Sequence, residues 1–333
     1  MGNKEDKKSI TSKKHKAFVI FRFPNKSKIN IINGYAEVAN DLNKTKDGFV
    51  IQSFDTKKNF IIKKAEVKAD FSLMPKFKKP TTSKKSFIQY INAIKQAIKN
   101  NQFEKVVAAK GLAVAKPKNY DPLIHFQNAL EYQEAFVCLI FIENQLCWLC
   151  ATPELLLKTT DKTITTYSLA GTVKGNNNFS KKEIIEQSIV TKDILEKLEK
   201  LDELKKSTLS SKIIANGDLK HLLAEIKAKK KRKISWQKIA HLLHPTPATA
   251  GFPVNLAQSF IKKNETLVRG FYSGFLGVVS KDNAKLFVNL RCVDISDKEL
   301  YFYGGCGITD GSNPEKEWQE TEHKVDILRS LIS

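Results

Sequence analysis

The apolar residues in the first part of the chain occur in short runs that alternate with polar residues and turn signals. Such alternation predicts β-strands, because a period of two places one set of side chains on a buried face. The predicted strands lie at residues 17–23, 29–32, 48–52 and 59–62. Residues 1–15 are polar and basic, and we expect them to be disordered. A segment rich in Lys, Pro, Ser and Thr at residues 75–85 is typical of a linker.

The rest of the chain mixes helical and strand patterns. Apolar residues that recur every three or four positions predict helices at residues 86–100, 121–134, 181–204 and 236–243. Shorter apolar runs predict strands at residues 105–109, 136–143, 145–150, 163–169, 271–280, 285–293 and 300–303. The elements do not follow the regular strand and helix alternation of a parallel sheet. The sequence therefore predicts an α+β fold with a mainly antiparallel core.

The last predicted strand leads into a glycine cluster and then into a helix start. Gly305 and Gly307 allow backbone N–H groups to approach a ligand closely, and Pro314 suits a first helical position. Glu317 and Glu320 follow with a spacing of three, which puts both carboxylates on one helix face. Acids in a first turn are common for electrostatic reasons alone, but such a pair is also able to bind a hard cation.

A second acidic pair has the same spacing. Glu183 and Glu186 lie near the start of the predicted helix at 181–204. One pair is ordinary, because capping and surface solvation produce many. Two pairs on two helices are a candidate carboxylate site for Mg²⁺, which prefers oxygen ligands and usually keeps several waters. Spacing alone leaves the structural and the metal-binding interpretations open.

Three further residues are candidates for chemistry. Lys105 begins an apolar strand, where it is either an exposed strand end or a buried base. Glu154 lies at a turn between apolar runs and either caps that turn or acts as a general acid. Arg291 lies within the predicted strand 285–293, where it faces solvent or, turned inward, holds a carboxylate.

Composition limits the class of protein. The chain has 333 residues, 41% of them hydrophobic and 27% charged, which is typical of a globular protein. No run approaches the roughly 18 apolar residues of a transmembrane helix, and the first residues lack the apolar region of a signal peptide, so we expect a cytoplasmic protein without a membrane partner. Five cysteines, an odd number, argue against a disulfide framework.

The formal net charge of +21 raises the question of nucleic-acid binding. The excess is mainly lysine scattered along the chain, without interleaved aromatic residues. This distribution favours a lysine-rich surface over a nucleic-acid site, so we expect no nucleic-acid partner. A positive field would help to attract a small anionic substrate.

Ordered sequence blocks resemble the chorismate-utilising enzymes, most closely the isochorismate synthases. The resemblance covers roughly residues 86–333. Its blocks are Lys105-Val-Val, Thr152-Pro-Glu-Leu-Leu, Leu169-Ala-Gly-Thr172, the helix with Glu183 and Glu186, His244-Pro-Thr-Pro-Ala, Arg269-Gly-Phe-Tyr-Ser-Gly, Arg291, Gly305-Cys-Gly-Ile and Glu317-Trp-Gln-Glu320.

The resemblance implies a fold and a set of roles. The fold is a large α/β sandwich around an antiparallel sheet, with the site in a cleft between its two halves. Lys105 would activate the water that adds at C2 of chorismate, and Glu154 would protonate the hydroxyl that leaves C4. Glu186 and Glu320 would bind Mg²⁺, with Glu183 and Glu317 in support through water. The substrate-binding residues would be Thr172, His244, Arg291, Gly305 and Gly307.

Within this family the lysine at position 105 favours water over ammonia as the nucleophile. We therefore expect an isochorismate synthase that depends on Mg²⁺ and serves menaquinone or catechol siderophore synthesis, with chorismate as its small-molecule partner. A salicylate synthase, which also eliminates pyruvate, is the main alternative, and a non-catalytic basic binding protein is a remote one. We expect a monomer in which residues 16–85 complete the sheet of the catalytic region 86–333.

Overall fold

The structure is a computed structural model that describes residues 14–39, 42, 45–175, 178–179, 181–216 and 219–332. Most of the N-terminal segment that we expected to be disordered, residues 1–13, lies outside this range, whereas His15 already begins the first strand. Among the described residues, no helix is both long and apolar enough to cross a membrane.

One antiparallel sheet organises the fold. Its strands are β1 (His15–Arg22), β2 (Ile29–Val38), β3 (Gly48–Gln52), β4 (Asn59–Lys64), β5 (Lys105–Ala115), β6 (Phe136–Ile142), β7 (Leu146–Thr152), β8 (Leu155–Thr159), β9 (Thr163–Lys174), β10 (Thr208–Asn216), β11 (Leu219–Lys229), β12 (Gly251–Phe252), β13 (Phe275–Val279), β14 (Ala284–Val288), β15 (Cys292–Ile295) and β16 (Glu299–Ile308). Their order in the sheet is β10-β11-β9-β8-β14-β13-β3-β4-β2-β1-β6-β7-β15-β16-β5-β12.

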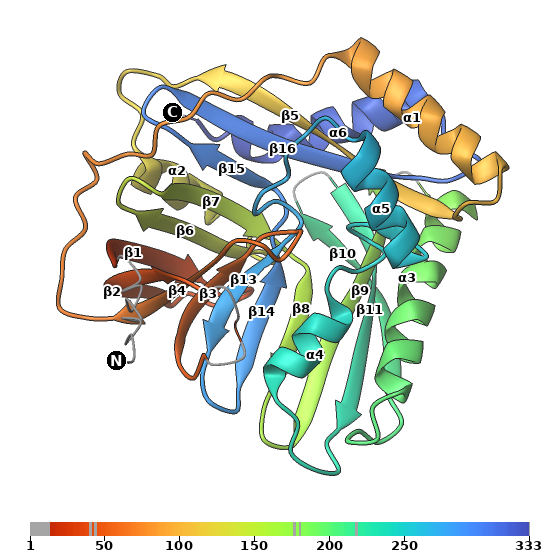
Figure 1. Cartoon of the computed structure of the whole chain (residues 1–333), viewed down its shortest axis with the longest axis horizontal. Coiled ribbons are helices and arrows are strands. Elements are labelled where there is room, and N and C mark those ends of the chain that lie inside the picture. Colours follow the sequence, from red (N-terminus) through yellow and green to blue (C-terminus); the bar gives the residue numbers. More distant parts are fainter. Residues whose placement is uncertain are drawn as a thin grey trace, which may run out of the picture.

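The helices cover the outer faces of this sheet. They are α1 (Lys84–Lys99), α2 (Pro122–Ala129), α3 (Lys181–Glu199), α4 (Trp236–Leu243), α5 (Val254–Asn264) and α6 (Pro314–Arg329). Figure 1 shows α3 along β9 and β11, with α1, α5 and α6 beside the long strands β5 and β16. The expected α+β fold with a mainly antiparallel core is therefore confirmed.

The apolar core is divided between the interior of the sheet and its helix-covered faces. The interior cluster joins residues from strands far apart in this order, including Phe49 of β3, Trp148 of β7 and Tyr303 of β16. A second cluster packs α3 and α4 against β8, and a third packs α2 and α6 against β6 and β7. The sheet therefore folds over on itself, with a shared apolar interior and helices outside, as hydrophobic burial requires of a layered domain.

Two features were missed by the sequence patterns. The sequence patterns predicted no element in residues 205–233, yet these contain the hairpin β10–β11. In β11 the buried residues Ala224, Ile226 and Ala228 alternate with Glu225 and Lys227, a strand pattern that the high lysine content obscured. Helix α5 was also missed. It buries Ala257 and Ile261 with the spacing of four residues that a short amphipathic helix requires.

The prediction of one long strand over residues 285–293 was wrong. Strand β14 ends at Val288, and β15 begins at Cys292. Between them, Leu290 and Arg291 carry the chain from the β14 neighbourhood to that of β15, which lies far along the strand order. Pro153 and Glu154 make the same crossing between β7 and β8. Two candidate site residues therefore lie in crossing segments rather than within strands.

The two crossings are held against each other by backbone hydrogen bonds. The Val288 N–H donates to the Glu154 carbonyl at 3.0 Å, and the Ala151 N–H donates to the Arg291 carbonyl at 3.0 Å. Buried backbone groups need such partners, because an unpaired one costs about 1–3 kcal/mol. These bonds fix the backbone positions from which the side chains of Glu154 and Arg291 extend.

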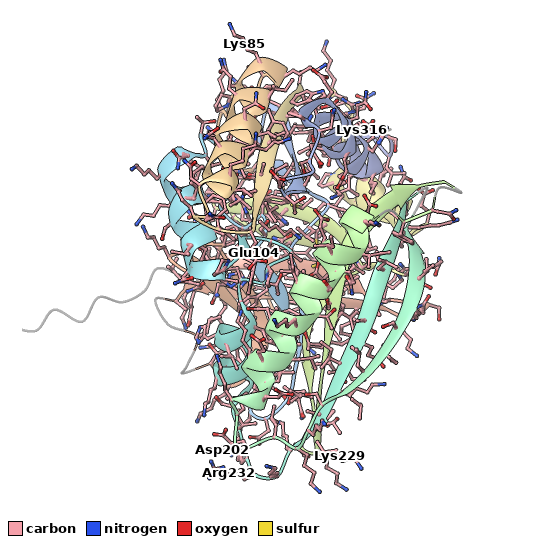
Figure 2. The ribbon with its side chains drawn as sticks, turned by 90° about the vertical axis from the view of Figure 1, so that its right-hand side faces the viewer. Lys85, Glu104, Asp202, Lys229, Arg232 and Lys316 are labelled. Atoms are coloured by element: carbon pink, nitrogen blue, oxygen red, sulfur yellow. The ribbon has the colours of Figure 1, made fainter. Side chains whose placement is uncertain are left out.

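The lysine excess is distributed over the outside of the molecule. Figure 2 shows nitrogen-tipped side chains around the whole outline, with Lys85 and Lys316 at one end and Lys229 and Arg232 at the other. All four of these basic residues are exposed. This distribution agrees with the lysine-rich surface that the sequence predicted.

A buried ion pair connects the end of α5 to strand β5. The guanidinium of Arg269 donates to both carboxylate oxygens of Glu265, at 2.6 and 2.8 Å, and both side chains are 3% exposed. Arg269 also donates to the carbonyls of Val107 and Thr249, and Glu265 accepts from the Ala109 N–H. The pair therefore secures β5 immediately after Lys105.

We expect Glu265→Gln to lower the free energy of unfolding by about 3–5 kcal/mol, because it leaves a buried guanidinium without its counter-charge. Urea denaturation followed by circular dichroism measures this. The control is Glu203→Gln, which removes an ion pair whose lysine, Lys238, is 54% exposed, and should change stability much less. Equal effects of the two substitutions would contradict the structural role given to Arg269 and Glu265.

Candidate functional site

A cavity of about 750 Å³, partly open to solvent, lies where the two parts of the sheet meet α3 and α6. Seven of the predicted site residues line it: Lys105, Glu154, Glu186, Arg291, Gly305, Gly307 and Glu320. They come from β5, both crossing segments, both acid-bearing helices and β16. The fold thus brings together residues that are up to about two hundred positions apart in the chain.

Lys105 and Glu186 meet at Gly307. A Cβ atom on Gly307 would lie 2.6 Å from Oε1 of Glu186 and 2.7 Å from Cε of Lys105, which is closer than real Cβ atoms approach other atoms. Lys105 is 2% exposed and Glu186 is 7% exposed. Only glycine at position 307 therefore allows the lysine and the glutamate to share this wall of the cavity.

Glu154 is almost fully buried, at 1% exposure. Burial raises the pKa of its carboxyl to about 8, although the charges of Arg291, Lys105 and Lys324 act in the opposite direction. Within the described part of the chain, its Oε1 atom has no hydrogen-bond partner. The carboxyl is therefore neutral near neutral pH and has a proton to donate into the cavity.

Arg291 enters the cavity from a strained backbone. Its φ of 46° lies in the left-handed region that residues with a side chain rarely adopt. Ser273, which also lines the cavity, has a φ of 62°. Burial lowers the pKa of Arg291 to about 10, with Glu154 acting against this shift, and the group remains a cation at neutral pH. Strain of this kind at two cavity residues is typical of functional sites.

The four predicted metal ligands separate into two groups. Glu186 of α3 and Glu320 of α6 line the cavity, whereas Glu183 and Glu317 do not. Glu320 accepts a hydrogen bond from Nζ of Lys324 at 2.7 Å. Among residues 14–332 as far as they are described, no three acidic, histidine or cysteine side chains lie close enough together to form a metal site by themselves. Two carboxylates from separate helices that line one cavity are nonetheless donors of the kind that Mg²⁺ uses when waters and substrate complete its coordination.

Two predicted substrate-binding residues, His244 and Thr172, are not among the residues that line the cavity. His244 is buried, its Nε2 lies 3.2 Å from the Phe54 carbonyl, and burial lowers its pKa to about 4. It does not line the cavity, and its loop reaches the cavity through Ala248 instead. The side chain of Thr172 lies outside the described part of the structure.

Sequence reasoning missed three cavity residues. Tyr272 and Tyr303 stack with their rings 5.2 Å apart, and the hydroxyl of Tyr303 accepts a hydrogen bond from Lys79 at 2.8 Å. Lys324 donates to the Gly305 carbonyl at 2.8 Å and to Glu320. The spacing of four residues from Glu320 to Lys324 was the available signal, because it puts both side chains on one helix face. The tyrosines gave no signal distinct from core packing.

Comparison with known proteins places this chain in a family. The model of the chorismate-binding enzymes matches residues 16–333. Isochorismate synthase MenF of Escherichia coli (strain K12) is 28% identical over 271 residues, which make up 75% of this chain and 60% of MenF. The chain thus spans about three-fifths of the length of this relative.

Solved structures show the same fold at lower sequence identity. The structure of the menaquinone-specific MenF of Escherichia coli has a TM-score of 0.81 at 20% identity, covering 97% of this chain and 90% of that one. Anthranilate synthase component I of Streptococcus pneumoniae has a TM-score of 0.68 at 15% identity, covering 98% and 95%. Because enzymes of different activity share the fold, the fold alone does not determine the reaction. The chain belongs to the chorismate-binding enzyme family.

Proposed function

We propose that this chain is an isochorismate synthase that converts chorismate to isochorismate with Mg²⁺. One observation carries the proposal: the buried side chains of Lys105 and Glu154, the latter with a pKa raised to about 8, line the same cavity from different segments of the fold. The similarity to isochorismate synthases supports it. The reaction adds a hydroxyl at C2 and removes one at C4, so it needs a base and an acid at separate ring carbons.

Lys105 is the proposed base and Glu154 the proposed acid. The lysine amine takes a proton from water as its oxygen bonds to C2, both ring double bonds shift by one position, and the C4–oxygen bond breaks. Glu154 gives its proton to the departing oxygen, which leaves as water. A neutral carboxyl is required for this step, and burial supplies it at Glu154. A buried lysine suits the other role, since burial disfavours the ammonium form.

Cationic groups are available for the carboxylates of chorismate. Arg291 is buried in the cavity wall and suits the enolpyruvyl carboxylate, because a guanidinium binds a carboxylate through two parallel hydrogen bonds. Gly305 and Gly307 bring the β16 backbone to the cavity surface. The segments that contain His244 and Thr172 reach the cavity through Ala248 and Leu169. This proposal assigns no separate role to the side chains of His244 and Thr172.

Mg²⁺ fits the carboxylate side of the cavity. Glu186 and Glu320 would hold it, and Glu183 and Glu317 lie one turn earlier on the same two helices. When bound, the ion would neutralise and orient the ring carboxylate of the substrate. Lys324, now paired with Glu320, would have to share that carboxylate with the ion.

The product of the purified protein tests the proposal. Chorismate is incubated with and without Mg²⁺, and products are identified by chromatography and mass. Isochorismate formed only with Mg²⁺ supports the proposal, and further conversion to salicylate and pyruvate would make the chain a salicylate synthase. Unchanged chorismate would contradict the proposal and favour a non-catalytic binding protein. A monomeric state, a cytoplasmic location and a role in menaquinone or siderophore synthesis stay predictions.

Gly307→Ala should abolish most activity while the protein stays folded, because a Cβ there displaces Lys105 and Glu186 together. Steady-state kinetics and circular dichroism measure the two effects. Gly311→Ala is the matched control in the following turn, where a Cβ meets no atom within 4 Å. Similar kinetics for the two variants would contradict the shared wall described above.

Activity should fall as pH rises through about 8, because the form of Glu154 that donates a proton is lost above its pKa. Glu154→Gln should lower kcat by roughly 10²–10⁴-fold. The residual kcat of this variant should not fall as pH rises through about 8. The pH dependence of kcat at saturating chorismate measures both effects. A variant that keeps the parent profile would exclude Glu154 as the acid.

Glu186→Gln and Glu320→Gln should each raise the Mg²⁺ concentration for half-maximal activity by roughly tenfold or more, since each removes a charged oxygen ligand. Glu315→Gln is the control, because Glu315 is exposed on α6 and pairs with Lys84. Initial rates over a Mg²⁺ titration measure the effect. Parent-like titrations for both variants would place the ion elsewhere.

A further inference from the structure

A second cavity lies beside the catalytic one and has a different character. It has about 660 Å³ of empty space and is lined by lysines from three strands: Lys158 of β8, Lys212 of β10 and Lys285 of β14. One acid, Glu134, also lines it. We call this space the lysine cavity. Its positive charge has no role in the proposed reaction.

Two of these lysines face each other across neighbouring strands. Lys285 of β14 pairs in register with Lys158 of β8. Like charges directly opposite each other in an antiparallel pair are destabilising. Among the ion pairs of the described residues, neither these two lysines nor Lys212 has an acidic partner. The fold therefore concentrates positive charge here without neutralising it.

The surroundings of Lys285 increase the electrostatic repulsion between the lysines. Its side chain is half-buried, and its ammonium lies 3.7 Å from the centre of the Phe23 ring rather than beside a carboxylate. Burial, followed by the charges of Lys158 and Lys26, lowers the pKa of Lys285 to about 8. Glu225, the other nearby acid, is paired with Lys227 and lies beside Tyr167. A bound anion would relieve the repulsion.

Apart from Asn25, the remaining walls of the cavity are mainly apolar. They are Pro24, Pro153, Leu155, Tyr167, Leu223 and Phe287. Such walls suit a ring, and the lysines suit a carboxylate attached to it. Inorganic phosphate would satisfy the lysines but leave the apolar walls unused.

We propose that the lysine cavity is an accessory binding site for a small aromatic carboxylate. The ligand's carboxylate lies between Lys158 and Lys285, and its ring lies against Tyr167 and Leu223. Pro153 lines both cavities, and Leu155 faces this one while Glu154 faces the other. An occupant therefore contacts the residues on both sides of Glu154. Binding itself does not depend on the proposed reaction.

Benzoate is the probe, with neutral benzamide and inorganic phosphate for comparison. Equilibrium dialysis with the full chain should show saturable benzoate binding, and binding at least about tenfold weaker for benzamide and phosphate. Lys158→Gln/Lys285→Gln should weaken benzoate binding at least about tenfold. Lys281→Gln, an exposed lysine on the turn before β14, should not change it.

Arg291→Gln distinguishes this site from the catalytic cavity. Benzoate binding that survives in Arg291→Gln and is lost in the double lysine variant supports the proposal. Loss in Arg291→Gln alone, equal binding of benzamide, or parent-like binding by the double variant would each overturn it. Should the double variant not melt cooperatively, the exposed single change Lys158→Gln replaces it and should still weaken binding.

Discussion

The burial of charged groups between two parts of one sheet is the constraint on which the rest of this structure depends. Lys105, Glu154, Glu186 and Arg291 are each less than 9% exposed, yet each carries a group that is strongly hydrated in water. Such groups stay ionised or change protonation according to their neighbours. At Glu154 the cost of desolvation outweighs three nearby cations and leaves a neutral acid. The same burial that is unfavourable for stability thus provides the proton that the proposed reaction needs.

The fold makes this burial possible through the two crossings of the chain. Glu154 and Arg291 lie where the chain leaves one group of strands for another, and backbone hydrogen bonds hold these segments together. A residue at a crossing is free of the alternation that sends every second side chain of a strand to the other face. Both side chains can therefore point into the same space. The left-handed backbone of Arg291 is part of this arrangement.

Much of the candidate site could be predicted from the sequence, because several of its residues belong to short motifs with recognisable spacing. The paired acids on two helices, the lysine that starts β5 and the glycines of β16 were all found from pattern and family resemblance, and most of them line one cavity. Features that depend on pairing between distant strands could not be found. Arg291 was assigned to a strand that ends before it, the hairpin β10–β11 was hidden by its lysines, and the opposition of Lys158 and Lys285 exists only through their register.

The most direct test of the central claim follows the oxygen atom. Chorismate is converted in water enriched in ¹⁸O, and the position of the label in the product is determined by mass spectrometry. If Lys105 activates the attacking water, the product should carry one labelled hydroxyl, at C2. The Lys105→Ala variant should form no labelled product while still binding chorismate. A product without label, or labelled product from Lys105→Ala at the parent rate, would contradict the assignment of base and acid to these two ring carbons.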